Sequence, residues 1–142
     1  MRVDFYVVND PDPESTGLIV CRLLEKVYNR GHRVFVFCAD KPAADWIDEL
    51  LWTYKDDAFV PHHLQGEGPV PAPPIQIGHN APHGFNDLLL NLSPEIPDFY
   101  TGFKRVLQVV GTDEPSKEIA RAHYKIYRAQ GCELHTHQLS EL

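Results

Sequence analysis

The chain has 142 residues, which is the usual length of one domain and too short for two full ones. Hydrophobic residues make up 43% and charged residues 23%, enough apolar material for a packed core, which argues against a disordered chain. The formal net charge of -7 argues against direct nucleic-acid binding as the main activity, because neutralisation of phosphates dominates such affinity. The net charge does not exclude a local basic surface.

The first half of the chain alternates predicted strands and helices. Residues 3–8 are β-branched and aromatic and end in a cluster of turn-forming residues, which predicts a strand. Apolar side chains at three- and four-residue spacings then predict a helix, which Gly31 ends. Residues 33–38 form a continuous apolar run, typical of a strand buried on both faces of a parallel sheet. Asp40 can cap the second predicted helix, whose apolar positions run to Leu51.

The character of the chain changes after this second helix. Between residues 59 and 82, six prolines exclude a helix and restrict any strand to 75–77. Two further stretches, at 87–92 and 105–110, predict strands.

A last helix follows, capped by Thr112 or Asp113 and ended by Gly131. The polar residues 132–142 are expected to form a tail that is loose in part. Because the elements alternate, right-handed crossovers between parallel strands are implied. We therefore predict one α/β domain over residues 1–142, with a Rossmann-like three-layer fold in which helices flank a mostly parallel sheet.

Neither export nor a membrane span is expected. The apolar runs are far shorter than the roughly 20 residues that cross a bilayer, and the amino terminus lacks the pattern of a signal peptide. The three cysteines, Cys21, Cys38 and Cys132, are widely spaced, so they predict buried thiols rather than disulfides or a zinc knuckle. These features predict a cytoplasmic protein.

The sequence offers little for catalysis or for a cofactor. The turns after the first two predicted strands have no glycine, which a dinucleotide-binding fingerprint needs so that the backbone can reach the pyrophosphate. No GxSxG elbow surrounds a serine, and glycines and prolines around the histidines at 79 and 83 disfavour a helical metal site. We expect no catalytic residue, cofactor or metal. A nucleotide-binding enzyme on a Rossmann-like sheet is kept as the alternative.

The last predicted helix carries a stripe of four cations and one aromatic ring at helical spacing: Lys117, Arg121, Tyr124, Lys125 and Arg128. No acidic residue lies within it, in a chain that is acidic as a whole. Like charges one turn apart repel unless an anion compensates, so the stripe suits a docking face for a short acidic peptide. Cations also suit the carboxyl end of a helix dipole, and the sequence leaves both explanations open.

A second cluster of interest is aromatic. Trp52 lies at the end of the second predicted helix, and Phe59 follows a charged stretch at 55–57. An exposed aromatic pair with a charged rim is typical of a protein–protein hot spot. The alternative, which the sequence supports equally well, is that the two aromatic side chains pack in the core beneath a loop.

Three parts of the chain resemble the chi subunit of bacterial DNA polymerase III, in the same order and over the full length. They are the opening strand Phe5-Tyr6-Val7-Val8, the stretch from Leu51-Trp52 through Phe59-Val60-Pro61-His62 to Gly66-Glu67-Gly68-Pro69, and the last helix from Lys117 to Arg128. The middle stretch is the most specific. Residues 78–100 and 132–137 depart from the pattern of better-known members.

The resemblance implies a non-catalytic accessory subunit of the DNA polymerase III holoenzyme, in its clamp loader, with a Rossmann-like fold. Such a subunit forms a 1:1 heterodimer with the psi subunit, which connects it to the clamp loader. It also binds the acidic carboxyl-terminal tail of single-stranded DNA-binding protein during DNA replication, and so contacts nucleic acid only indirectly.

The resemblance also implies two binding sites, carried over position by position. The site for the tail of single-stranded DNA-binding protein falls on Val110, Lys117, Arg121, Tyr124 and Lys125. The psi-binding face falls on Trp52 and Phe59.

Overall fold

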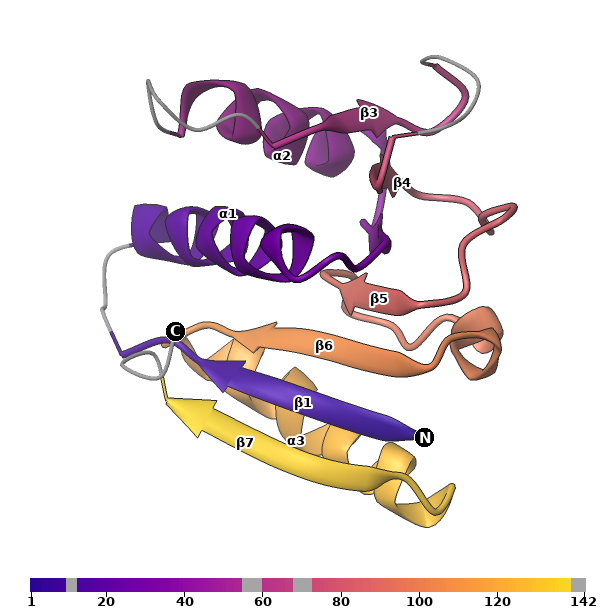
Figure 1. Cartoon of the computed structure of the whole chain (residues 1–142). Helices are drawn as coiled ribbons and strands as arrows, with labels where there is room; N and C mark the ends of the chain where they lie inside the picture. The colour runs from indigo at the N-terminus through magenta and orange to yellow at the C-terminus, as the bar shows by residue number, and fades with distance from the viewer. Residues whose placement is uncertain (10–12, 55–59, 68–72, 139–142) are drawn as a thin grey trace.

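The computed structural model describes residues 1–9, 13–54, 60–67 and 73–138 (Figure 1). Its strands are β1 (Arg2–Val7), β2 (Val34–Phe37), β3 (His62–Leu64), β4 (Ile75–Gly78), β5 (Leu88–Asn91), β6 (Arg105–Val110) and β7 (Glu133–Gln138). Its helices are α1 (Pro13–Asn29), α2 (Lys41–Thr53), α3 (Glu114–Ala129) and the short 3-10 helix Asp98–Gly102. Every predicted helix and strand is present, and β3 and β7 are additional.

The strands form one sheet in the order β3-β4-β2-β5-β6-β1-β7, and every pairing in it is parallel. This confirms the predicted α/β class and extends the expected mostly parallel sheet to a fully parallel one. The central strands β2 and β5 consist almost entirely of apolar residues. This composition suits them because both faces of each strand are covered.

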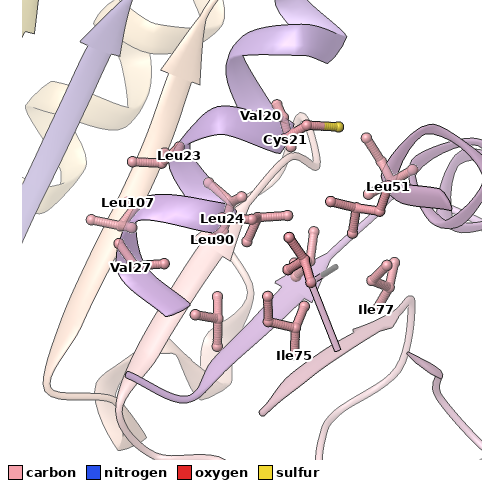
Figure 2. Packing of buried hydrophobic residues seen from close by; sticks show 14 of the residues in the cluster. Val20, Cys21, Leu23, Leu24, Val27, Leu51, Ile75, Ile77, Leu90 and Leu107 are labelled. Atoms are coloured by element: carbon pink, nitrogen blue, oxygen red, sulfur yellow. The ribbon is translucent and has the colours of Figure 1, made fainter. Parts of the chain in front are cut away.

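Two apolar cores lie on opposite faces of the sheet, which confirms the three-layer arrangement. On one face, α1 and α2 pack on the sheet, and Figure 2 shows Leu23 and Leu24 of α1 among the strand residues Leu90 and Leu107. On the other face, Tyr127 of α3 packs with aromatic and aliphatic side chains from β1, β2, β5, β6 and the segment before β6. The side chains of α3 and those of α1 and α2 therefore serve different faces.

The predicted helix ends are confirmed by local hydrogen bonds and backbone angles. The Asp40 carboxylate accepts a hydrogen bond from the backbone N–H of Ala43 at 3.0 Å, so it caps α2. Asp113 accepts from the backbone N–H of Ser116 at 3.0 Å and caps α3. Gly131 follows α3 with φ of 81°, in the left-handed region that favours glycine.

Part of the segment predicted to be a polar tail is a strand, and its residues 139–142 lie outside the described residues. Residues 133–138 form the edge strand β7, which pairs in parallel with the whole of β1. The segment lacks an apolar face because an edge strand is half exposed, and backbone pairing and polar side-chain contacts to β1 hold it in place. Sequence patterns that depend on alternating hydrophobicity do not detect such a strand.

The proline-rich region also holds one strand more than predicted. β3 has three residues, and its two histidines are buried. So short a strand carries no recognisable period, and the prolines around it are typical of a loop, so the sequence does not predict it.

Cys21 and Cys38 are buried as predicted, and burial raises the pKa of the Cys21 thiol to about 11. None of the helices in the described ranges has the length and apolar character needed to cross a membrane.

Candidate peptide-binding groove

A groove of about 500 Å³ lies between α3 and the sheet, and it brings the predicted tail-binding residues together. Figure 1 shows α3 behind β6, β1 and β7, the three strands at this end of the sheet. All five residues predicted for tail binding line the groove: Val110, Lys117, Arg121, Tyr124 and Lys125. Arg128, the last cation of the stripe, lines it as well.

The floor of the groove is apolar and comes from alternate residues of three strands. Phe5 and Val7 of β1 face α3, whereas Asp4 and Tyr6 face the opposite side, because successive side chains of a strand alternate. Val110 of β6 lies opposite Val7 in the register, which brings the two side chains to one end of the floor.

Tyr124 and Thr136 complete the apolar part of the groove. The Tyr124 ring lies with its centroid 5.8 Å from that of Phe5, so it forms a side wall while remaining 38% exposed. Thr136 of β7 pairs with Phe5 and borders the floor on the other side. An apolar side chain that entered here would contact aromatic and aliphatic groups on several sides.

Buried polar contacts fix the rotation of α3 about its own axis. The Tyr127 hydroxyl donates to Oε1 of Gln108 at 2.7 Å, and Nε2 of Gln108 lies 3.0 Å from Nδ1 of His123. Nε2 of His123 lies 2.9 Å from the carbonyl oxygen of Pro94, so it is the nitrogen that donates. Burial lowers the pKa of His123 and favours the neutral ring that this network needs. Because His123 and Tyr127 are buried against the sheet, the cationic stripe of α3 is exposed to solvent.

Helical spacing places Ile119, Ala120 and Tyr127 on the core side of this helix, with Ala122 and Ile126 as further candidates. This prediction is confirmed for Tyr127 and Ala120 and wrong for Ile119 and Ile126. Ile126 is 48% exposed, and the face that is buried is that of His123 and Tyr127. His123 was not expected there because a histidine counts as polar in a periodicity search. It fills the core here because both of its ring nitrogens find partners.

The cations of the stripe are exposed, and an acidic residue reaches two of them. Oε1 of Glu114 lies 3.7 Å from Nζ of Lys117, and Oε2 of Glu114 lies 3.6 Å from Nη2 of Arg121. Glu114 lies outside the stripe, which itself holds no acidic residue, but it partly neutralises the amino end of the stripe. Lys125 and Arg128 form no ion pair with any residue that the structure describes. Among the described residues, therefore, none compensates the positive charge at the carboxyl end of the stripe through an ion pair.

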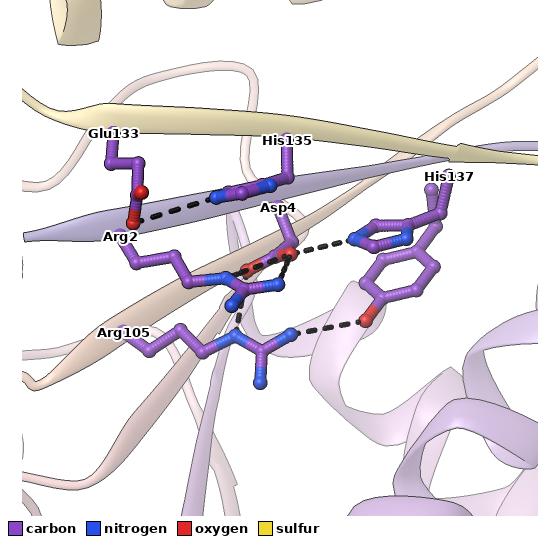
Figure 3. Close-up of polar contacts among 7 residues, drawn as sticks. Arg2, Asp4, Arg105, Glu133, His135 and His137 are labelled. Carbon is purple, nitrogen blue, oxygen red and sulfur yellow. Dashed lines mark hydrogen bonds and ion pairs between the residues drawn. The ribbon is translucent and has the colours of Figure 1, made fainter.

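A buried carboxylate on the far side of β1 holds the three floor strands together (Figure 3). Oδ2 of Asp4 accepts from Nε of Arg105 in β6 at 2.6 Å, and Oδ1 lies 2.6 Å from Nε2 of His137 in β7. Arg2 adds contacts from β1 itself, at 3.1 Å from both oxygens. Burial is the largest single influence and raises the pKa of Asp4, but the hydrogen bonds together outweigh it and hold that pKa at about 2, below its ordinary value. Asp4 is thus ionised at neutral pH and links β1, β6 and β7.

Sequence reasoning found the cations of the groove and missed most of its floor. Phe5 and Val7 could have been found, because alternation along the predicted first strand places them on one face. Thr136 could not, since it lies in the segment expected to be a tail. Ala120, which helical spacing places on the core side of the last helix, packs against the core and also borders the groove.

The structure describes half of the predicted psi-binding pair. Trp52 lies in the last turn of α2 with 58% of its surface exposed, and its ring centroid is 4.7 Å from that of His62. Phe59 lies outside the described residues. Since α2 and α3 cover opposite faces of the sheet, Trp52 and the groove lie on different sides of the molecule.

A second crevice lies where the alternative of nucleotide binding would place its ligand. It has a volume of about 510 Å³. Asn91 and Gly111, at the carboxyl ends of β5 and β6, line it together with Trp46 of α2. The amino terminus of α3 opens into it, but the Asp113 carboxylate already occupies the Ser116 N–H. A phosphate would meet this negative charge, so the crevice does not favour a nucleotide.

Comparison with known proteins places the chain in a family. Residues 1–135 match the family model described as DNA polymerase III chi subunit, HolC. DNA polymerase III subunit chi of Pseudomonas aeruginosa is 37% identical over 142 residues, which cover 99% of each chain. The corresponding subunit of Escherichia coli K12 is 34% identical over 139 residues, covering 93% of this chain and 94% of the relative. That of Haemophilus influenzae is 35% identical over 134 residues, covering 93% of both.

The fold and the groove define a Rossmann-like α/β protein with a cationic, apolar-floored cleft on one face. The chain belongs to the DNA polymerase III chi subunit family. This membership supports an accessory role in DNA replication.

Proposed function

We propose that this chain is a non-catalytic accessory subunit of the DNA polymerase III clamp loader, working in the cytoplasm, and that its groove binds the acidic tail of single-stranded DNA-binding protein. One observation carries the proposal. The cations Lys117, Arg121 and Lys125 border an apolar floor that holds Val110, and Tyr124 closes one side. An acidic peptide with an apolar end has the complementary chemistry.

The expected affinity follows from the number of contacts that such a groove can offer. Each charge-assisted hydrogen bond contributes about 1.5–3 kcal/mol where the bound peptide shields it from water. A short tail makes few of them and loses conformational entropy when it orders, so we expect micromolar binding. Because the cations are exposed, added salt should weaken the complex. Weak binding suits a partner that coats DNA in many copies, since multiplicity raises the local concentration.

The proposal is tested by calorimetric titration with single-stranded DNA-binding protein from the same organism, full length and lacking its last residues. We expect micromolar binding of the full-length protein, a lower affinity at raised ionic strength, and no detectable binding of the truncated form. Equal binding of both forms would exclude the tail as the ligand. Naked single-stranded DNA serves as a further control, and comparable affinity for it would favour a direct DNA binder.

We propose that Trp52 belongs to a second interface, for psi or a protein that takes its place, on the face opposite the groove. Its exposed indole gives an aromatic anchor that a partner could bury. Binding of the two partners on different faces would let this subunit connect the clamp loader to protein-coated DNA.

Replacing Trp52 with alanine should weaken binding of the psi partner about 30-fold, because a buried tryptophan anchor contributes about 2 kcal/mol. The affinity for the acidic tail should stay unchanged. Biolayer interferometry with each partner in turn measures both effects. Trp46→Ala, a matched loss of an exposed indole elsewhere on α2, serves as the control. If both variants weaken tail binding as well, the two interfaces are not separate.

A further inference from the structure

Glu114 already places a carboxylate on the cations of the groove. It is the first residue of α3, one turn before Lys117 and two turns before Arg121. Its two oxygens divide between these cations, at 3.7 Å from Nζ of Lys117 and 3.6 Å from Nη2 of Arg121. A carboxylate that bridges a lysine and an arginine has the geometry expected of an acidic ligand at this site.

The pairs that Glu114 forms are exposed and easily broken. Side-chain exposure is 73% for Glu114, 47% for Lys117 and 57% for Arg121. Water and salt screen such pairs strongly. The amino end of a helix attracts negative charge, so Glu114 stays near these cations even when it does not contact them.

The stripe therefore has two halves in different electrostatic states. Glu114 partly neutralises Lys117 and Arg121 at its amino end. Lys125 and Arg128 at its carboxyl end have no ion pair within the described part of the chain. As far as the described ranges show, an approaching anion meets two cations without an ion pair at one half and two cations already paired with Glu114 at the other.

We propose that Glu114 is an internal competitor of the acidic ligand, which must displace its carboxylate from Lys117 and Arg121 to bind fully. The inference rests on the proposed function, since it concerns the same groove. Lys125 and Arg128 attract the ligand first, and a ligand carboxylate then replaces Glu114. Glu114 thus lowers the affinity for acidic tails and discriminates against ligands with too few carboxylates to displace it.

The test compares Glu114→Gln with the unmodified protein, using a fluorescent peptide of several aspartates that ends in phenylalanine with a free carboxylate. Anisotropy titration should show about threefold tighter binding by the variant, because one competing charge is gone. Its affinity should also fall more steeply with salt, since one more net cation takes part. Glu49→Gln removes the same charge from an exposed site on α2, on the other face of the sheet, and should leave the affinity unchanged.

A double-substitution cycle separates local competition from a general change of charge. Arg121→Ala should cause a larger fold-loss of affinity in the Glu114→Gln background than in the unmodified protein, because Arg121 is partly occupied only when Glu114 is present. Thermal melts of all variants check that α3 remains folded. Equal fold-losses in the two backgrounds would show that the residues act independently and would overturn the inference.

The outcomes distinguish the inference from the proposed function. Tighter binding by Glu114→Gln and unchanged binding by Glu49→Gln support both. If the unmodified protein binds the peptide and Glu114→Gln binds it equally or more weakly, the competitor role is wrong and the groove stands. If neither protein binds the peptide at any ionic strength tested, the tail-binding function fails, and the competitor role fails with it.

Discussion

Replacing Arg121 with alanine should weaken binding of the acidic tail about 30-fold, equivalent to about 2 kcal/mol. Arg121 lies near the middle of the cationic stripe and borders the groove beside Tyr124. Its planar guanidinium can hold a ligand carboxylate through two parallel hydrogen bonds, which a lysine cannot reproduce. Isothermal titration with the tail peptide measures the change.

Two further variants make the Arg121 result specific. Arg121→Lys keeps the charge and should recover only part of the affinity, because the forked geometry is lost. Arg22→Ala removes an exposed arginine from α1 on the opposite face and should leave the dissociation constant unchanged. An Arg121→Ala protein that binds the tail as tightly as the unmodified one would contradict the proposed role of the groove.

Replacing Asp4 with asparagine should lower the free energy of unfolding by about 3 kcal/mol. The Asp4 side chain is fully buried and contacts Arg105 from β6, His137 from β7 and Arg2 from its own strand. The substitution removes the negative charge that compensates these groups and loosens the edge strand β7. Urea denaturation followed by circular dichroism measures the loss.

The acid dependence of stability gives an independent readout of Asp4. Its folded pKa of about 2 lies below the ordinary value of 3.8, so the unfolded chain takes up the proton first as pH falls. The associated stability, about 2 kcal/mol, is present above pH 3.8 and is lost between there and the folded pKa. The Asp4→Asn protein should lack this component.

Asp45→Asn is the matched control for Asp4. Asp45 is exposed, and its ion pair with Lys41 spans one helical turn, so its loss should change the unfolding free energy by less than about 0.5 kcal/mol. Equal stability of the Asp4→Asn and unmodified proteins at neutral pH would show that the buried cluster contributes little. The three floor strands would then be held by backbone pairing and apolar packing.

The fold was predictable where local pattern and burial agree. The run at 34–38 is apolar throughout because both faces of β2 are covered. Asp40 marks the start of α2 through a hydrogen bond within its own turn. β7 was not predictable, because its stability comes from a partner strand more than a hundred residues away. A polar edge strand and a polar tail have the same composition.

The candidate groove was predictable on its helical side only. Lys117 to Arg128 lie on one helix, so spacing alone places them on one face. The pairing of Thr136 with Phe5 depends on the register of β1 with β7, which no local pattern encodes. The contacts of Asp4 with Arg105 and His137 are long-range for the same reason, and a single aspartate within an apolar strand does not indicate them.

Titration of the isotope-labelled protein with the acidic tail, followed by nuclear magnetic resonance of the backbone amides, tests the account most directly. The account predicts saturable shifts along α3 from Lys117 to Arg128 and in β1 around Val7, while the amides of α2 near Trp52 stay unchanged. Shifts centred on α2, or none at saturating peptide, would contradict it.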